Sequence, residues 1–246
     1  MKIINSQKFN CLPDGILFDT DNTLYSYDPA HSAALEALMQ KISKNFSIEK
    51  NDFLKFFKKA REDVKSRLGN TAASHSRLLY IQRMLEMMGL GSQVLTVLDL
   101  EQTYWRTFLN NATLFDGVYD LLDDIRLLGI PTSIVTDLTA QIQFRKVVYF
   151  GLDNYFENIV TSEETGHDKP HKSTFELAVK KMKIKGENIW MIGDNPVNDI
   201  AGAKNAINAV TIQKIHKGVV EGKGNNMPDA TFKDFKSLRK LILKLA

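Results

Sequence analysis

Six short apolar runs, separated by segments of helical pattern, most constrain the fold of this chain. Each run is bounded by turn or helix signals, and together they cover residues 16–18, 131–136, 158–161, 188–193, 209–212 and 230–232. Strands that alternate with helices favour a parallel sheet covered by helices on both faces. The sequence therefore predicts an α/β fold built on a Rossmann-like, doubly wound parallel sheet.

The alternation of strands and helices stops between residues 27 and 111. Four helical segments take its place, at residues 31–46, 49–68, 75–88 and 92–110. Apolar residues recur at helical spacing within residues 76–88, which indicates the core of a helical bundle. We therefore expect an α/β core from residues 1–26 and 112–246, and an all-helical domain from residues 27–111 inserted between its first two strands.

The composition is that of an ordinary soluble globular protein. Of the 246 residues, 43% are hydrophobic and 25% are charged, and the formal net charge is only +3. Such a charge requires neither a nucleic-acid partner nor a membrane surface, and we expect neither. Cys11 is the single cysteine, so disulfides within the chain and cysteine metal sites are excluded. With no secretory-signal pattern at the start, the sequence predicts a cytoplasmic protein and leaves monomer or homodimer open.

Two carboxylates, Asp19 and Asp21, directly follow the first apolar run. Burying a carboxylate costs several kcal/mol unless something compensates its charge. A divalent cation with oxygen ligands is the obvious compensation. One carboxylate of such a pair can attack an electrophile while the other transfers a proton.

Polar residues also follow the other predicted strands. Thr136 and Asp137 end the second strand, Asp194 ends the fourth with Asp199 five residues beyond it, and Lys169 comes after the third. Ligands of a doubly wound sheet bind outside the carboxyl ends of its strands. Each of these residues alone is ordinary, but together they predict a functional site at this edge of the sheet.

Four motifs across residues 15–202 resemble those of the haloacid dehalogenase-like superfamily of phosphohydrolases, in the same order. In this sequence they are Asp19-Thr20-Asp21-Asn22-Thr23, then Thr136, then Lys169-Pro170, and finally Gly193-Asp194 with Asp199. The helical insert between the first and second motifs resembles the C1 cap of that superfamily's subfamily I. The resemblance therefore implies a phosphatase with a cap domain.

The resemblance also implies roles for four residues of the first three motifs. Asp19 would attack phosphorus and form an aspartyl-phosphate, and Asp21 would act as general acid and base. Thr136 and Lys169 would bind the phosphoryl oxygens. Asp137 stands where the superfamily frequently has Asn, and it is a further candidate substrate contact unless it faces away.

Mg²⁺ is the cofactor that the resemblance implies. Its ligands would be the carboxylates of Asp19 and Asp194 and the backbone carbonyl of Asp21. Asp199 would lie outside these ligands and orient one of them or a bound water.

The expected function is Mg²⁺-dependent hydrolysis of a small phosphorylated metabolite, which is a sugar phosphate, a sugar-acid phosphate or a nucleoside monophosphate. A phosphomutase of the same superfamily is the alternative, since it keeps both aspartates of the first motif. A receiver-type signalling domain is disfavoured because such domains are shorter and lack the helical insert, and a non-catalytic phosphate-binding module is disfavoured by the complete motif set. Within the insert, His31, His75 and Arg77 are the candidate readers of the leaving group.

Overall fold

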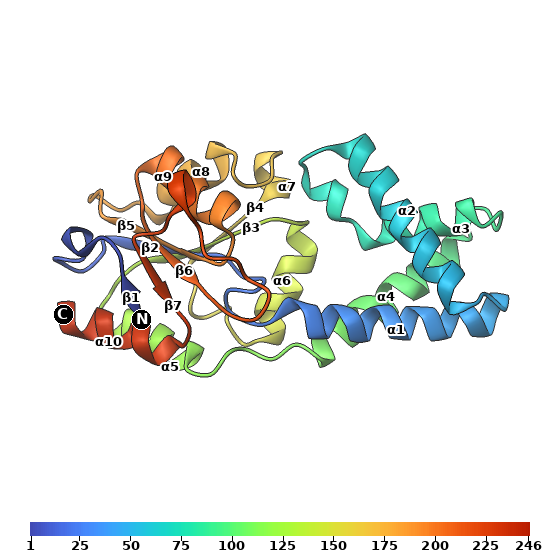
Figure 1. The fold of residues 1–246 in the computed structure, drawn as a ribbon, viewed down its shortest axis with the longest axis horizontal. Helices are drawn as coiled ribbons and strands as arrows, with labels where there is room; N and C mark the ends of the chain where they lie inside the picture. The colour runs from blue at the N-terminus through green and yellow to red at the C-terminus, as the bar shows by residue number, and fades with distance from the viewer. The chain divides into compact units, whose positions relative to one another are not determined.

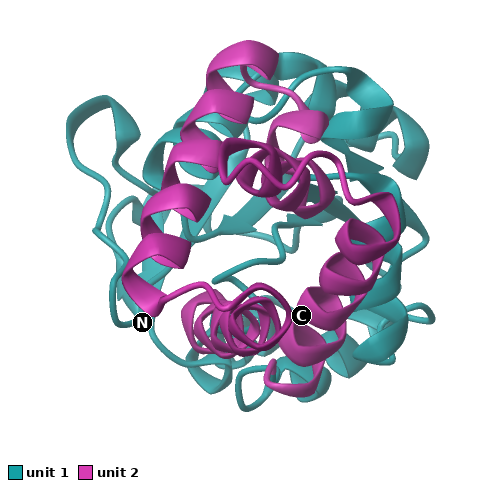
Figure 2. Ribbon diagram, turned by 90° about the vertical axis from the view of Figure 1, so that its right-hand side faces the viewer, with its two compact units in different colours: residues 1–26, 113–246 teal, residues 27–112 magenta.

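The chain forms two compact units, coloured separately in Figure 2. The computed structural model describes all residues from Met1 to Ala246. Unit 1 comprises Met1–Ser26 and Thr113–Ala246, and unit 2 comprises Tyr27–Ala112. None of the helices is both long enough and apolar enough to cross a bilayer.

Unit 1 is built on a seven-stranded sheet with the strand order β1-β7-β6-β5-β2-β3-β4 (Figure 1). All neighbouring strands are parallel except β1, which pairs antiparallel with β7. The strands are β1 (Lys2–Ile3), β2 (Gly15–Phe18), β3 (Thr132–Thr136), β4 (Asn158–Thr161), β5 (Ile189–Gly193), β6 (Val210–Lys214) and β7 (Ala230–Phe232). The predicted α/β class with a largely parallel sheet is confirmed; β1 was not predicted.

Helices cover both faces of this sheet. They are α5 (Val118–Leu127), α6 (Ala140–Tyr149), α7 (Ser162–Thr165), α8 (Lys172–Met182), α9 (Gly202–Ile207) and α10 (Phe235–Leu245), with short turns η1 (Ser6–Lys8), η3 (Pro196–Ala201) and η4 (Gly224–Asn226). Helix α8 packs on β2, β3 and β4, α9 packs on β6, and α10 packs on α5 and β7. Figure 1 shows α8 and α9 on one face and α5 and α10 on the other. This double cover explains why the central strands are apolar almost throughout.

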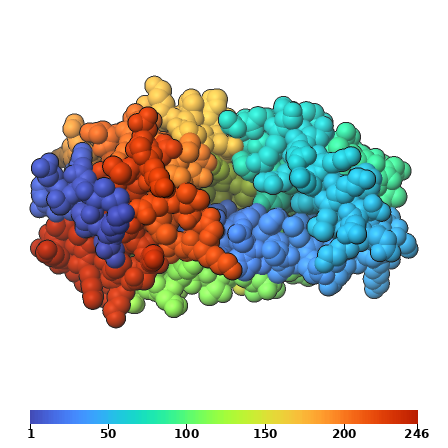
Figure 3. Space-filling model, in the orientation of Figure 1, coloured from blue at the N-terminus to red at the C-terminus, as the bar shows by residue number.

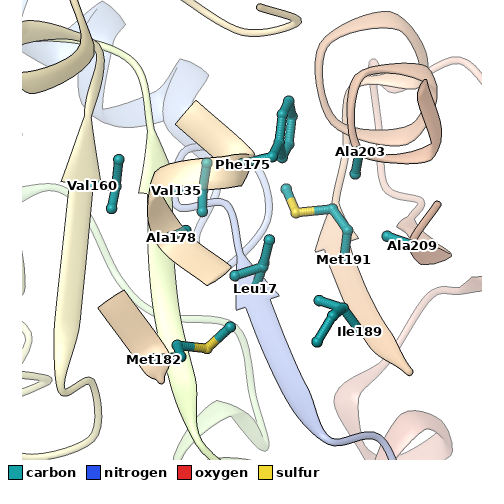
Figure 4. Close-up of a cluster of buried hydrophobic side chains, with 10 residues drawn as sticks. All are labelled: Leu17, Val135, Val160, Phe175, Ala178, Met182, Ile189, Met191, Ala203 and Ala209. Carbon is teal, nitrogen blue, oxygen red and sulfur yellow. The ribbon is translucent and has the colours of Figure 1, made fainter. Parts of the chain in front are cut away.

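The core under α8 fixes the strands beside one another (Figure 4). Leu17 of β2, Val135 of β3 and Met191 of β5 are fully buried against Phe175 and Ala178 of α8. Burying each large side chain of this kind contributes roughly 1.5–3 kcal/mol. The resulting register brings the carboxyl ends of β2, β3 and β5 to one edge of the sheet.

The N-terminal segment closes the β7 edge of the sheet. The backbone N–H groups of Ile4 and Asn5 both donate to the carbonyl of Asp229, each at 2.9 Å. Figure 3 shows this segment, in blue, on the surface of unit 1 beside the red C-terminal region. Covering the edge leaves fewer unpaired backbone groups on β7 for another chain to bind.

Unit 2 is all-helical, as the sequence predicted. Its elements are α1 (Tyr27–Phe46), α2 (Lys50–Leu68), the 3₁₀ turn η2 (Ala72–His75), α3 (Arg77–Met87) and α4 (Val94–Asn110). Helix α1 packs against α4, and α2 packs against α3. Fully buried side chains at helical spacing, such as Leu38 and Ile42 on α1, form its core.

Candidate active site

Asp19 lies at the end of β2 in a fixed orientation. Its backbone N–H donates to the carbonyl of Ile192 at 2.9 Å, which ties it to β5. Only 6% of the residue is exposed. The carboxylate Oδ2 accepts a hydrogen bond from Thr23 Oγ1 at 2.8 Å, and Oδ1 accepts one from Lys169 Nζ at 2.7 Å. Contacts on both oxygens therefore determine where this carboxylate points.

Lys169 is a buried cation held between two carboxylates. Its Nζ donates to Asp19 Oδ1 and Asp199 Oδ1, each at 2.7 Å, and to the Val135 carbonyl at 3.0 Å. Burial alone would lower the pKa of Lys169, but the charges of Asp19 and Asp199 outweigh it and raise the pKa well above its usual range. Lys169 is therefore positively charged at neutral pH.

The turn after β5 positions Asp199, which lies on η3 and is buried. Its Oδ2 accepts from the backbone N–H of Asn195 at 2.9 Å, and the Asn195 side chain in turn caps the turn by accepting from Val197 and Asn198. A Cβ atom at Gly193 would lie 2.5 Å from the Asp199 side chain. Only glycine permits this approach, which gives the Gly-Asp-x4-Asp spacing a steric basis.

Asp19, Asp194 and Asp199 each bring a carboxylate oxygen within 4.8 Å of the other two. Lys169 is the only cation bonded to this group. Burial, reinforced by the charges of Asp19 and Asp199, raises the pKa of Asp194 to about 9. Burial likewise raises the pKa of Asp19 to about 6, although Lys169 acts in the opposite direction. The cluster therefore carries more negative charge than its protein surroundings neutralise.

This donor set suits a hard divalent cation. Both oxygens of Asp199 are already engaged, by Lys169 and by the Asn195 N–H. The Asp194 carboxylate makes no hydrogen bond, and it faces the charge of Asp19. A cation shared by Asp19 and Asp194 would relieve their repulsion, and carboxylate oxygens are the ligands that Mg²⁺ prefers.

Thr136 and Asp137 lie at the same edge, at the end of β3. The Thr136 hydroxyl lies 2.9 Å from the Thr20 hydroxyl and accepts a hydrogen bond from Gln143 Nε2 at 2.8 Å. The Asp137 carboxylate accepts from the backbone N–H of Lys169 at 2.9 Å. Burial raises the pKa of Asp137, and Lys169 partly offsets this. Asp137 therefore orients the Lys169 loop, a contact that the sequence did not predict.

Asp21 is half-buried and contacts residues that sequence analysis missed. Lys146 Nζ donates to its two carboxylate oxygens at 2.7 and 3.0 Å, and the Tyr25 hydroxyl donates to one of them. Lys146 lies on α6 and is only 2% exposed. Gln143 and Lys146 are three residues apart and so share one helix face. The sequence does contain a signal for these two residues: both are polar and lie at helical spacing on the buried face of the helix that follows Thr136.

The three residues predicted as readers of the leaving group lie together in unit 2. Arg77, at the start of α3, donates to the His75 carbonyl at 2.6 Å and to the Tyr27 hydroxyl. His31 on α1 places its Nδ1 2.7 Å from the Tyr104 hydroxyl of α4. His31 and Arg77 thus belong to one polar and aromatic cluster, to which His75 contributes its backbone.

Comparison with known proteins identifies relatives over most of the chain. The model of a family described as haloacid dehalogenase-like hydrolase matches residues 13–206. A ribulose-1,5-bisphosphate 5-phosphatase from Halopiger xanaduensis is 34% identical over 198 residues, which cover 80% of this chain and 82% of that protein. A glyceraldehyde 3-phosphate phosphatase from Methanocaldococcus jannaschii is 25% identical over 231 residues, covering 93% and 95% of the two chains.

Solved structures share the fold. The HAD-hydrolase YfnB from Bacillus subtilis superposes with a TM-score of 0.70 at 21% identity, covering 95% of this chain and 99% of that one. A 2-haloacid dehalogenase from Pseudomonas syringae superposes with a TM-score of 0.71 at 22% identity, covering 94% and 98%. At these identities the likeness concerns the fold alone.

Proposed function

The chain belongs to the haloacid dehalogenase-like family of hydrolases and is one of its phosphatases, and we propose from this premise that Asp19 is the nucleophile of its reaction. The observation that carries the proposal is the buried Asp19 carboxylate, held by Thr23 and Lys169 beside Asp194 and Asp199. An Asp19 oxygen attacks phosphorus, the bond from phosphorus to the ester oxygen breaks, and an aspartyl-phosphate forms. Water then attacks this phosphorus, the bond from phosphorus to the Asp19 oxygen breaks, and inorganic phosphate leaves as the Asp19 carboxylate is restored.

The neighbouring residues supply proton transfer and charge. Asp21 gives a proton to the departing alkoxide and then takes one from the attacking water. Its half-buried carboxylate is accessible enough for both steps and is held by Lys146. Lys169 and the Thr136 hydroxyl bind the phosphoryl oxygens, whose negative charge grows in the transition state.

Mg²⁺ is the cofactor that these residues would hold. The carboxylates of Asp19 and Asp194 and the backbone carbonyl of Asp21 would hold it, while Asp199 keeps Lys169 in place beside them. When bound, Mg²⁺ neutralises phosphoryl charge that would otherwise repel the Asp19 carboxylate.

The substrate is a small phosphorylated carbohydrate. Two relatives are named for the phosphate esters of a five-carbon and a three-carbon sugar, and this supports the choice among the metabolites that the sequence left open. The groups at the sheet edge bind the phosphoryl unit and the metal, so they do not read the sugar. We assign that task to unit 2, acting as the cap domain.

Asp19→Asn tests the mechanism. We expect hydrolysis of p-nitrophenyl phosphate with Mg²⁺ to fall by more than about a thousandfold, because an amide cannot act as the nucleophile. Asp153→Asn is the matched control, since this exposed aspartate removes the same charge from unit 1. Denaturing the wild-type protein during turnover should trap a phosphorylated chain, and Asp19→Asn should trap none.

Release of inorganic phosphate distinguishes hydrolysis from the mutase alternative, which would yield an isomeric ester. An Asp19→Asn protein that folds and keeps more than about a hundredth of the activity would contradict the covalent mechanism. Turnover that persists unchanged after chelation of divalent cations would contradict the role of Mg²⁺.

A further inference from the structure

Gln143 is a buried amide that uses its hydrogens and leaves its oxygen without a donor. It lies on α6, seven residues after Thr136, and is only 1% exposed. Its Nε2 donates to Thr136 Oγ1 at 2.8 Å and to the backbone carbonyl of Asp137 at 2.7 Å. Its Oε1 is buried and accepts no hydrogen bond from a protein group. A buried acceptor without a donor lowers stability, so packing alone does not explain a glutamine at this place.

The contact with Asp137 determines which end of the Gln143 amide faces Thr136. A backbone carbonyl oxygen can only accept a hydrogen bond, so the group 2.7 Å from it must be the NH₂ end of the amide. The same nitrogen lies 2.8 Å from Thr136 Oγ1. An amide nitrogen only donates, so Thr136 Oγ1 is the acceptor in that hydrogen bond.

This hydrogen bond restricts where the Thr136 hydroxyl can direct its own hydrogen. A hydroxyl has one hydrogen and two acceptor lone pairs. Because Gln143 occupies one lone pair, the hydrogen must point to another neighbour. The nearest is the Thr20 hydroxyl, whose Oγ1 lies 2.9 Å away, while the carbonyl of Asp137 is farther, at 3.4 Å.

Thr20 can exchange roles with Thr136. Either hydroxyl can be the donor in their 2.9 Å contact, because each carries one hydrogen. When Thr20 donates, Thr136 Oγ1 accepts from Thr20 and Gln143 together, and both of its lone pairs are occupied. Its own hydrogen is then directed to a third group, and a phosphoryl oxygen at the sheet edge is such a group. Thr20 and Thr136 are at most 4% exposed, so water competes little for this hydrogen.

We propose that Gln143 is a positioning residue, which directs the hydrogen of the Thr136 hydroxyl to a phosphoryl oxygen of the substrate. This inference rests on the proposed function, since it requires Thr136 to bind the phosphoryl group. It adds to that function a residue that acts only through Thr136. A donor that is already oriented stabilises the growing phosphoryl charge better than a donor that must first turn.

A double-mutant cycle on Gln143 and Thr136 tests the proposal, with p-nitrophenyl phosphate and Mg²⁺. Thr136→Val keeps the shape of the side chain but removes the hydroxyl, and we expect kcat/KM to fall by roughly ten- to a hundredfold. Gln143→Met keeps the length of the side chain without its donors and should cause a smaller loss, of roughly five- to tenfold. When Thr136→Val is already present, Gln143→Met should cost less than about twofold, because no hydroxyl is left to orient.

A second measurement shows which half of the substrate is affected. Because Thr136 acts on the phosphoryl group, Gln143→Met should lower the single-turnover rates of an alkyl and an aryl phosphate equally. A general distortion of α6 would also displace Lys146 from Asp21, and it would slow the alkyl ester more, since an alkyl leaving group needs protonation. Gln141→Met is the matched control, because Gln141 is exposed on the same helix, and it should leave both rates unchanged.

Gln143→Glu replaces only the NH₂ group and guards against a Gln143→Met protein that does not fold. At pH 8 its ionised carboxylate accepts but cannot donate, so it should draw the Thr136 hydrogen away from the phosphoryl group and lower kcat/KM at least as much as Gln143→Met. Losses that multiply in the double variant, a folded Gln143 variant with wild-type activity, or a larger loss for the alkyl ester would overturn the Gln143 inference alone. Failure of both Gln143 variants to fold would also overturn it, by making Gln143 a structural residue.

Other outcomes concern the proposed function itself. Unchanged activity in Thr136→Val would contradict phosphoryl binding by Thr136. A wild-type protein that hydrolyses neither ester with Mg²⁺ would contradict the phosphatase mechanism, and the role of Gln143 would fail with it.

Discussion

At the scale of single residues, Lys146 fixes the orientation of the Asp21 carboxylate. The ammonium group bonds both carboxylate oxygens, and the Tyr25 hydroxyl bonds one of them. Because Lys146 is almost fully buried, its position is fixed by the packing of α6. A carboxylate that transfers protons must face the leaving group within hydrogen-bond distance, so a small rotation of Asp21 would be costly. Lys146 is therefore a positioning residue for the proposed general acid.

Lys146→Met should lower kcat by roughly ten- to a hundredfold, a part of the 10²–10⁴-fold that general acid–base catalysis contributes. KM should change less, since Lys146 acts through Asp21, whose two carboxylate oxygens it bonds. The loss should be larger for an alkyl phosphate than for p-nitrophenyl phosphate, whose leaving group needs little protonation. Single-turnover rates on the two esters would measure this difference.

Arg145→Met is the control for Lys146→Met, because Arg145 is the exposed neighbour on the same helix. Lys146→Arg should restore part of the rate by keeping a cation beside Asp21. Equal losses for alkyl and aryl esters would show that Lys146 supports the fold of the site in general and not Asp21 in particular.

The residues at the sheet edge were predictable to different degrees. Asp19, Lys169 and Asp199 follow apolar runs, and parallel strands bring such positions to one edge, so their proximity could be expected from the sequence. Their hydrogen bonds agree with that expectation, while their catalytic roles stay predictions. The Lys146–Asp21 contact joins residues 125 positions apart, and no motif marks it. Sequence analysis missed it because no motif or strand end marks Lys146, which lies on a helix that was not predicted.

At the scale of elements, the turn between β5 and η3 shows why the site needs glycine. A methyl group on Gly193 would overlap the buried Asp199 side chain, whose oxygens hold Lys169 and the Asn195 N–H. Gly193→Ala should therefore destabilise the protein by about 1–3 kcal/mol, the usual cost of overpacking. Thermal unfolding would measure this, together with a weaker stabilisation by Mg²⁺. An unchanged unfolding temperature would mean that η3 moves aside freely.

The elements that the sequence predicted best are those with apolar surroundings on both faces. Strands β2, β3 and β5 are buried on both faces, so their apolar runs stand out from the polar segments around them. Helix α6 was not predicted, because Gln143 and Lys146 interrupt the apolar pattern on its buried face. Strand β1 is only two residues long and exposed, so its pairing with β7 leaves no pattern in the sequence. Sequence analysis therefore missed α6 because of the polar residues on its buried face, and missed β1 because it is a very short strand at the edge of the sheet.

At the scale of the whole molecule, uncompensated negative charge gathers at the sheet edge of unit 1. In unit 1, three carboxylates face one bound lysine, which favours a metal cation. The protein without ligands thus retains electrostatic strain that binding relieves, a common property of functional sites.

This strain should appear as a dependence of stability on pH and Mg²⁺. The pKa values of Asp19 and Asp194 are raised to about 6 and about 9 in the folded, metal-free protein. Between about pH 4 and pH 9 the folded state therefore holds protons that the unfolded state has released. The contribution of these two groups to the free energy of unfolding accordingly falls as pH rises through that range.

Mg²⁺ should reverse this fall, because it binds the ionised carboxylates and must displace their protons at lower pH. At a fixed Mg²⁺ concentration, the increase in Tm over the chelated protein should therefore grow from pH 5 to pH 8. A ligand at a hundred times its Kd stabilises by about 2.7 kcal/mol, which is easily measured as a shift in Tm. Asp194→Asn should reduce the Mg²⁺-dependent increase in Tm. It should also weaken the fall in stability of the metal-free protein above pH 6, whereas Asp153→Asn should have neither effect. An increase in Tm that is the same at pH 5 and pH 8 would show that the cation binds elsewhere. Only a site where Mg²⁺ displaces protons makes the Mg²⁺-dependent increase in Tm vary with pH.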